Sequence, residues 1–548
     1  MLLTCLAVCN AKETRQPSHA PLTPEQIALI DKASFQEKFL VKVIQQHTPL
    51  VQTYIQHMKT DPQLGDVPVS DEYLLGRVDF GGTFVDHLYE KRAKKKGMLS
   101  GSKRFIDRMT SMFKLQLSPN GFMDMMFIDT VDFDRKHYDF AYVRKEFLGE
   151  IKTSVFDVQP QTSKGQGRFI GRIWVDDEGG NVVRFTGTFS SGDRREVYFH
   201  FDSWRGNVQP DVWLPVAVYV QDQDFRGQTQ FWGYGLKLPT AGSGDNEHVT
   251  VEDASDVSDN GQDVSPLQAQ RQWENQTEQN VLDRLISAGL IANSSEFDQV
   301  LETVTNNLVI GNKLDLVNPV HCRVMLTSTL ESIAIGNTII LSKGLVDVLP
   351  DEANLAAVLS FQLAHIVLGH PINTRYAFSD RLLFPDESTL ERIAMNHSEK
   401  ENQEAAAKAV ELFKNSIYKD KLDSVGLFLE QLTGAEHQLP SLLTTRLGDS
   451  MLRPDGQPWL ADLGKGAPPL KVGDLQQIAA LPLGSHLRVD PWSDTVFQLQ
   501  VKAQPILSAS DKMPFQVTPI YYRLARYRPP TPGPVHGNNV SGVVPPVQ

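Results

Sequence analysis

The chain has 548 residues, several times the size of one ordinary globular core, so we expect about three domains. Hydrophobic residues make up 41% of the chain and charged residues 22%, which is typical of globular proteins. The net charge of −13 argues against a nucleic-acid partner. No apolar stretch approaches the ~20 residues that a membrane-spanning helix requires.

Residues 1–22 look like a degenerate secretion signal. The apolar start MLLTCLAVCNA lacks the usual basic residues and contains Cys5 and Cys9. If this leader is removed, Cys322 is left alone and no intramolecular disulfide can form. We therefore expect an exported bacterial protein, periplasmic or associated with the envelope membrane.

Residues 23–74 carry helical signals. Thr23 to Gln26 read as an N-cap, a proline at the first helical position and a capping-box glutamine. Apolar residues then recur near helical spacing, and the segment Leu50–Met58 continues the pattern after Pro49. The sequence therefore predicts a helical segment before the first sheet.

Residues 75–240 have the texture of an antiparallel β domain. Segments rich in β-branched and aromatic residues alternate with Gly, Asp and Asn turns, at 168–175, 181–189, 197–201 and 213–220. The run FIGRIWVDDEGGNVVRFTGTF followed by WLPVAVYV resembles the curved sheet of LolA-like lipoprotein-sorting domains. That resemblance implies a lipid or lipoprotein carrier and requires an apolar cavity; the alternative is a domain that only supports its neighbour.

The remaining boundaries come from composition. Residues 241–270 read as an acidic linker, 271–450 as a mainly helical domain, 451–528 as a small β-containing unit and 529–548 as a disordered tail. Strands are expected at 496–501 and 516–524, and the basic run at 91–96 reads as a solvated helix end or loop. The predicted fold class is α+β, with several domains.

The helical domain contains the most informative stretch. A strand at 323–326 and a hairpin at 331–341 precede a helix from Asp351 to Leu368, which Gly369 and Pro371 end. This order, with GLVDVLPDEANLAAVLSFQLAHIVLGH, resembles zinc metallopeptidases of family M-48, the HtpX and CAAX prenyl protease type. The resemblance implies a zincin-like fold, in which H-E-x-x-H places two zinc-binding histidines on one helical face with a general-base glutamate between them.

The positions that carry this chemistry have changed. Phe361 occupies the position of the first zinc histidine and Gln362 that of the general base, while His365 matches the second histidine after Leu363 and Ala364. In the family's third-ligand motif Asn402 replaces the glutamate. A register shift of one residue offers Glu401 as a substitute ligand.

These substitutions predict an inactive site without a bound cofactor. A phenyl ring has no lone pair, and an amide has no basicity near neutral pH. We therefore expect a pseudo-peptidase that binds a polypeptide or protein client, chaperone-like, along an exposed hairpin edge near Thr338–Leu341. A purely structural interpretation also exists: Phe361 is a residue of the hydrophobic core, and His365 is a buried histidine held by hydrogen bonds.

Two alternatives stay open beside the pseudo-peptidase. One is lipid carriage by the β domain. The other is an active zinc endopeptidase with a ligand set rebuilt from His365, His370, His397 and Glu401. Five residues separate His365 from His370, which places them about 140° apart around a continuous helix, a poor geometry for one ion.

Overall fold

The computed structural model describes most of two large units and a few further residues. The described residues are 21–47, 49–61, 65–77, 87–89, 123–130, 132–161, 168–189, 200–222, 225–234, 277–372 except 284, 287, 293 and 295, 395–469 except 466, 487–489, 496–498, 515 and 524–527. None of the helices among them is both long and apolar enough to cross a lipid bilayer.

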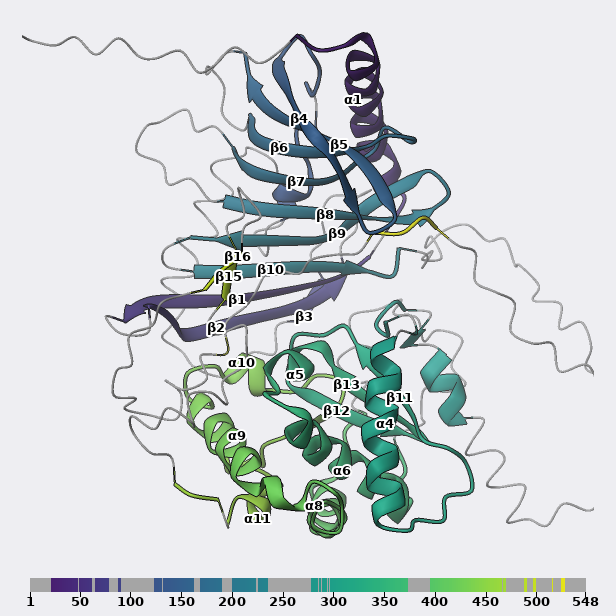
Figure 1. Cartoon of the computed structure of the whole chain (residues 1–548), viewed down its shortest axis with the longest axis vertical. Coiled ribbons are helices and arrows are strands. Elements are labelled where there is room, and N and C mark those ends of the chain that lie inside the picture. Colours follow the sequence, from purple (N-terminus) through teal and green to yellow (C-terminus); the bar gives the residue numbers. More distant parts are fainter. Residues whose placement is uncertain are drawn as a thin grey trace, which may run out of the picture.

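The first unit is built on a ten-stranded antiparallel sheet with the order β3-β2-β1-β10-β9-β8-β7-β6-β5-β4. Strands β4 to β10 follow one another as a meander, and β1 pairs with β10. The strands turn from nearly level at β1 and β2 to steep at β4 and β5, so the sheet is strongly twisted (Figure 1). The strands are β1 (Leu50–Asp61), β2 (Gly65–Arg77), β3 (His87–Tyr89), β4 (Tyr138–Leu148), β5 (Ile151–Pro160), β6 (Phe169–Asp176), β7 (Val182–Phe189), β8 (His200–Gln209), β9 (Val212–Gln221) and β10 (Phe225–Trp232).

The predicted helix at Leu50–Met58 is wrong, because these residues form β1. Leu50 and Tyr54 point into one hydrophobic core, whereas Val51 and Ile55 point into another. Both faces of β1 are therefore buried. Apolar residues on both faces of a strand imitate the i, i+4 spacing of a helix, and only pairing with β2 and β10 separates the two cases.

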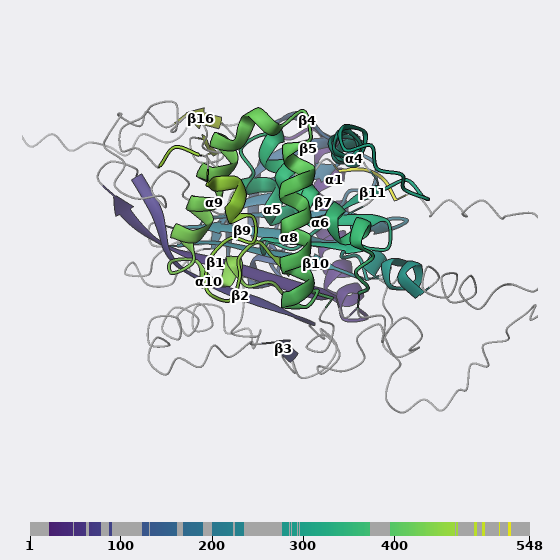
Figure 2. The same cartoon turned by 90° about the horizontal axis from the view of Figure 1, so that it is seen from below.

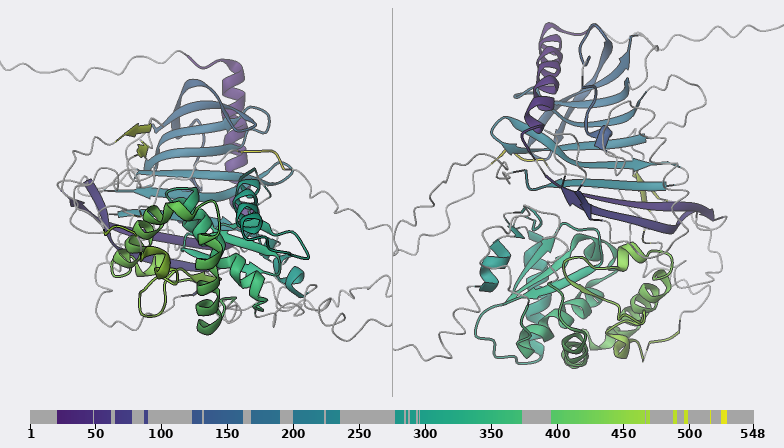
Figure 3. Two further views of the ribbon diagram at one scale, coloured as in Figure 1. Left: turned by 60° about the horizontal axis from the view of Figure 1, so that its bottom comes forward. Right: turned by 180° about the vertical axis from the view of Figure 1, so that it is seen from behind.

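Alternation along the strands divides the side chains of the sheet between its two faces. One face carries the apolar layer covered by helix α1 (Pro24–Ile44) and the 3-10 turn η1 (Met123–Met126). The opposite face packs against the helical unit near β1 and β10, and forms a smaller core around Trp174 and Trp204 further along. Helix α1, which has the predicted capping box at Thr23, runs across the strands (Figure 1; Figure 3).

The second unit, residues 277–465, is called the helical unit here. Its four-stranded sheet has the order β11-β13-β12-β14, with β11 at His321–Met325, β12 at Glu331–Ile335, β13 at Thr338–Ser342 and β14 at Asp449–Ser450. The predicted strand, hairpin and following helix are all present. Helices α8 and α9 lie on the side away from the large sheet (Figure 2). The helices are α4 (Glu296–Gly311), α5 (Lys343–Val348), α6 (Glu352–Leu368), α8 (Glu399–Lys414), α9 (Leu422–Ala435), α10 (Pro440–Leu443) and α11 (Ala461–Gly464), with a 3-10 turn η2 at Lys419–Lys421.

The hairpin edge expected to bind an extended chain is not an edge. Strand β13 pairs in parallel with β11 on one side and antiparallel with β12 on the other. The backbone groups of Thr338 to Leu341 are therefore used inside the sheet. The prediction of peptide addition at this segment is wrong, because a strand paired on both sides offers no free ladder.

A continuous core joins the two units. Tyr73 and Trp232 of the large sheet belong to the same buried cluster as the central residues of the helical unit. The Asp71 carboxylate on β2 accepts hydrogen bonds from the backbone N–H groups of Ser441 and Leu442, at 3.0 and 2.8 Å. Burial raises the pKa of Asp71, although these hydrogen bonds oppose the shift.

Several described residues of 451–528, the predicted C-terminal unit, pack into the two larger units. Trp459 and Leu463 are buried in the core of the helical unit, and Leu524 lies in the core on the far face of the large sheet. The Arg526 guanidinium forms two hydrogen bonds of 2.7 and 2.8 Å with Asp176. Strands β15 (Leu487–Val489) and β16 (Val496–Gln498) pair with each other. The leader up to residue 20, the basic run, the linker, the tail and residues 516–523 lie outside the described residues.

Candidate functional site

Helix α6 positions the residues that the sequence singled out. Its N-cap is Asp351, whose carboxylate accepts a 2.9 Å hydrogen bond from the backbone N–H of Asn354. Its C-cap is Gly369, which has a left-handed φ of 68° that glycine adopts without strain. Every side chain from Ala353 to His365 is buried, so α6 is the central helix of its unit.

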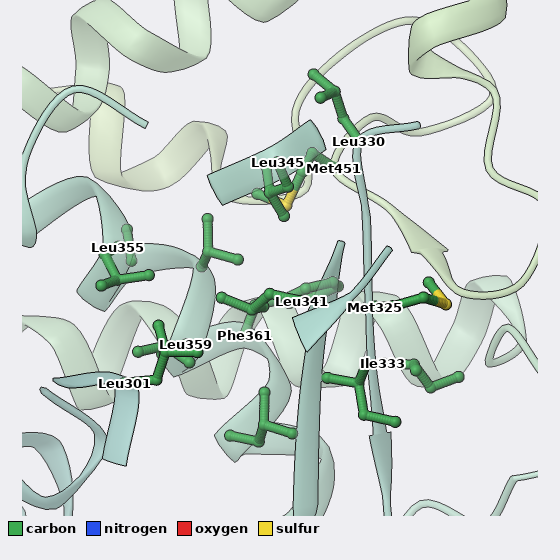
Figure 4. Packing of buried hydrophobic residues seen from close by; sticks show 14 of the residues in the cluster. Leu301, Met325, Leu330, Ile333, Leu341, Leu345, Leu355, Leu359, Phe361 and Met451 are labelled. Carbon is green, nitrogen blue, oxygen red and sulfur yellow. The ribbon is translucent and has the colours of Figure 1, made fainter. Parts of the chain in front are cut away.

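Phe361 belongs to the hydrophobic core. It is fully buried, and Figure 4 shows its side chain among Leu341, Leu359 and other aliphatic residues. Its ring meets the imidazole of His365 edge-on, with centroids 5.2 Å apart. The position that a zinc-binding histidine holds in the family thus carries a packed hydrocarbon ring.

Gln362 is held by neighbouring polar groups. Its side-chain amide nitrogen donates to the Ser332 hydroxyl at 2.8 Å and to an Asp449 carboxylate oxygen at 3.4 Å. The side chain is fully buried, and its amide oxygen has no hydrogen-bond partner among the described residues. Because an amide does not accept a proton near neutral pH, Gln362 cannot act as a general base.

Three histidines meet beside this helix. The imidazoles of His365 and His397 stack, with centroids 3.8 Å apart and planes 23° from parallel. The Nδ1 atoms of His365 and His370 lie 3.0 Å apart. His370 follows the left-handed Gly369, so the chain turns back and brings it to His365. The expected separation of 140° applies to a continuous helix and is wrong here.

Asp449 completes the group and was not anticipated from the sequence. It comes from β14, 84 residues after His365, and no local motif marks it. Its carboxylate accepts hydrogen bonds from the His397 backbone N–H at 2.8 Å and from His397 Nδ1 at 2.7 Å. Ligating atoms of His365, His397 and Asp449 all lie within 4.8 Å of one another.

The structure separates the two candidates for the third family ligand. Asn402 is buried, and its amide nitrogen donates to the His397 carbonyl at 3.3 Å and to Asp449 at 3.4 Å. Glu401 instead forms the capping box of α8, where its carboxylate accepts from the Ser398 backbone N–H and hydroxyl. These hydrogen bonds lower the pKa of Glu401. Glu401 is therefore not a substitute ligand in this arrangement, because its side chain is used at the exposed helix end.

Burial keeps the central imidazole neutral. Desolvation, reinforced by the neighbouring His397, lowers the pKa of His365 to about 3, although the Asp449 charge opposes the shift. At neutral pH the side chain of His365 is therefore uncharged and keeps one nitrogen lone pair. Its Nε2 atom and that of His397 have no hydrogen-bond partner among the described residues, and neither has the amide oxygen of Asn402.

A pocket of about 390 Å³ reaches this group from the surface. His397, Asn402 and Asp449 form part of its wall, and Trp459 and Arg453 also line it. Glu399 and Thr444, which also line it, are exposed. A small polar solute or an ion therefore has a route to the buried group.

The zinc set implied by the family resemblance does not fit these residues. At the three ligand positions Phe361 offers no lone pair and Asn402 offers only a neutral amide, so His365 is the one imidazole that remains. Without a base at Gln362, no hydrolytic step follows from this arrangement. The Asp–His contact and the unpartnered nitrogens support binding chemistry instead.

Two solved structures are among those that resemble part of the chain. No family model and no curated protein matches the chain. A DUF1329 family protein from Desulfovibrio piger is 12% identical, over 38% of this chain and 95% of its own, with a TM-score of 0.20. A LolA-superfamily protein from Nitrosomonas europaea is 11% identical, over 37% of this chain and 90% of its own, with a TM-score of 0.19. The peptidase resemblance rests on the quoted residues alone.

Proposed function

We propose that the chain carries a lipid, or the acyl chains of a lipoprotein, on the α1 face of the ten-stranded sheet. The observation that supports this is one apolar layer spread over many strands and covered, in the described part of the chain, by α1 and the turn η1. The layer includes four phenylalanines in mutual contact, Phe169, Phe185, Phe189 and Phe201, of which the last two stack with centroids 5.0 Å apart. A surface of this kind binds hydrocarbon without requiring a specific polar partner.

Carriage requires α1 to move. The carrier interpretation predicted an apolar cavity, but the described side chains of this face are packed beneath α1 and η1. Helix α1 buries Ile30, Ala33, Leu40 and Ile44 against the sheet. At ~1.5–3 kcal/mol for each large side chain, these contacts are worth on the order of 7 kcal/mol. A 16-carbon acyl chain offers on the order of 12 kcal/mol at ~0.8 kcal/mol per buried methylene, so it can compete for the same face.

The rim of α1 is polar and suited to reversible opening. Lys32 donates to the Glu178 carbonyl, Lys38 pairs with Asp134, and the Arg135 guanidinium binds Asp31 through two hydrogen bonds of 2.7 and 2.9 Å. Exposed ion pairs of this type contribute about 0–1 kcal/mol each. These rim contacts break at small cost, and the buried Glu37–Arg205 ion pair is the polar contact that opposes opening.

A disulfide between α1 and the sheet tests the proposal. A Cβ placed at Gly180 would lie 3.0 Å from the Cβ of Lys32, less than the ~3.5–4.5 Å that a disulfide spans, so α1 and the turn at Gly180, where φ is 69°, must shift slightly to form one. We expect a Lys32→Cys, Gly180→Cys protein, with Cys5 and Cys9 replaced by serine, to bind cis-parinaric acid saturably when reduced. The oxidised form should lose this binding, because α1 can no longer leave the sheet.

The same protein before and after dithiothreitol is the matched control for the two substitutions, and mass spectrometry verifies the cross-link. Displacement of the probe by palmitate should show that the binding is to an acyl chain. Equal binding in both redox states, or no saturable binding in the reduced and wild-type proteins, would contradict carriage beneath α1.

Polypeptide binding by the helical unit is the second candidate. The pocket beside β14 favours polypeptide binding. Strand β14 is an outer strand of the four-stranded sheet, and it contributes Asp449 and Ser450 to the wall of the pocket. We expect binding without cleavage, since Gln362 supplies no general base. Fluorescent casein incubated with the full chain should stay intact with or without zinc. Casein cleavage that a chelator stops would contradict the proposal that the helical unit has no peptidase activity.

A further inference from the structure

We propose that His365 and His397, with Asp449 holding the His397 ring in place, bind a divalent first-row transition-metal ion of the Zn²⁺ class at the inner end of the pocket. The three residues come from α6, from the segment before α8 and from β14. They are 0%, 3% and 1% exposed, and their ligating atoms lie within 4.8 Å of one another. Neutral imidazole nitrogens are ligands that such ions accept, and a carboxylate bonded to the other ring nitrogen is their usual support.

The proton positions around the group leave lone pairs facing it. His397 Nδ1 lies against the Asp449 carboxylate, so this nitrogen carries the proton and Nε2 carries the lone pair. The Nε2 of His370 lies 3.5 Å from the Glu404 carboxylate, which favours a proton there and makes His370 Nδ1 an acceptor. His365 Nδ1 then donates to His370, and the lone pair of His365 is on Nε2.

Unpartnered polar atoms supply the independent observation. His365 Nε2, His397 Nε2, and the amide oxygens of Gln362 and Asn402 are buried without a hydrogen-bond partner among the described residues. Each atom of this kind costs about 1–3 kcal/mol when it is left alone. A bound cation satisfies several buried lone pairs at once.

The contacts around Asp449 resemble the support that metal-binding histidines usually have. A carboxylate that accepts from Nδ1–H fixes the tautomer and orientation of the ring and raises the basicity of Nε2. Zinc–nitrogen distances are ~2.0–2.1 Å, so ligand atoms as much as 4.8 Å apart must move closer together to bind one ion. Because the two rings are 23° from parallel, one of them must also rotate. The 390 Å³ pocket provides the route of entry.

This site is not the zinc site implied by the peptidase resemblance, because only His365 belongs to both. At the family's other two ligand positions, Phe361 has no imidazole and Asn402 has no carboxylate. Gln362 supplies no general base. The inference is also independent of lipid carriage, which involves the other unit. The site binds an ion without peptide hydrolysis.

Metal titration of the full chain tests the proposal. After dialysis against EDTA, we expect calorimetry with ZnCl₂ and elemental analysis to give about one zinc per chain, with a rise in Tm by linkage. The conservative variants His365→Gln and His397→Gln should each lose the stoichiometric ion and the Tm rise. Asp449→Asn should weaken binding by about 10–100-fold, as loss of an orienting carboxylate does.

The matched control is His321→Gln, whose side chain is 56% exposed on β11 of the same unit. It should leave stoichiometry and affinity unchanged. Circular dichroism identifies a variant that fails to fold, and Co²⁺ added to the wild type then gives a visible spectrum that reports nitrogen ligation directly. Less than a tenth of an equivalent of zinc on the wild type, or unchanged binding in the folded His365→Gln, His397→Gln double variant, would overturn the proposal.

Discussion

Replacing Glu37 by alanine is expected to lower the free energy of unfolding by about 3–5 kcal/mol, the usual cost of breaking a buried ion pair. Glu37 on α1 and Arg205 on β8 are 2% and 1% exposed. The Arg205 guanidinium donates to both carboxylate oxygens of Glu37, and one of these hydrogen bonds is 2.8 Å long. Without Glu37, the Arg205 charge stays buried with the Val182 and Met126 carbonyls as partners. Urea denaturation of the full chain measures the loss.

Two further variants separate charge from packing. Glu37→Leu combined with Arg205→Met should recover most of the stability, because an apolar pair of similar volume replaces the ion pair. Asp31→Ala, on an exposed pair of the same helix, should cost under about 1 kcal/mol. A double variant less stable than Glu37→Ala would contradict this account. If α1 covers the lipid site, Glu37→Ala should also increase cis-parinaric acid uptake.

Replacing Glu331 by alanine should lower the free energy of unfolding by at least about 3 kcal/mol. This fully buried carboxylate on β12 accepts three backbone hydrogen bonds through one oxygen, from Arg446, Leu447 and Gly448 at 2.8, 2.9 and 3.2 Å. Its other oxygen accepts from the Thr327 and Thr329 hydroxyls at 2.9 and 2.6 Å. Alanine leaves the three backbone donors unpaired, at about 1–3 kcal/mol each. Chemical denaturation followed by circular dichroism measures the change.

The loop held by Glu331 leads directly into β14, so the same substitution should also displace Asp449 and weaken zinc binding. Glu411→Ala is the control, because its side chain is 58% exposed and pairs with Lys408 on the surface of α8. It should change the unfolding free energy by less than about 1 kcal/mol and leave zinc binding intact. A Glu331→Ala protein as stable as this control would show that the loop does not depend on the carboxylate.

Local chemistry made several elements predictable. Helix α1 has its capping box at Thr23, and α6 has its N-cap at Asp351 and its left-handed glycine at Gly369. Such signals work because they satisfy backbone groups within a few residues of the helix end. The β strands from 169 to 220 were likewise visible, because β-branched and aromatic residues there are bounded by turn residues. Periodicity failed at β1, where both faces are buried and a strand imitates a helix.

By itself, the sequence determined the chemical content of the altered positions. Phe361 cannot ligate a metal and Gln362 cannot take a proton in any fold, because these properties belong to the side chains. Only the tertiary structure decided what surrounds His365. Strand β13 became an internal strand through pairing with β11, Gly369 turned His370 back, and β14 brought Asp449 from 84 residues away. Such contacts depend on which distant segments share a core, and no local pattern in the chain encodes that.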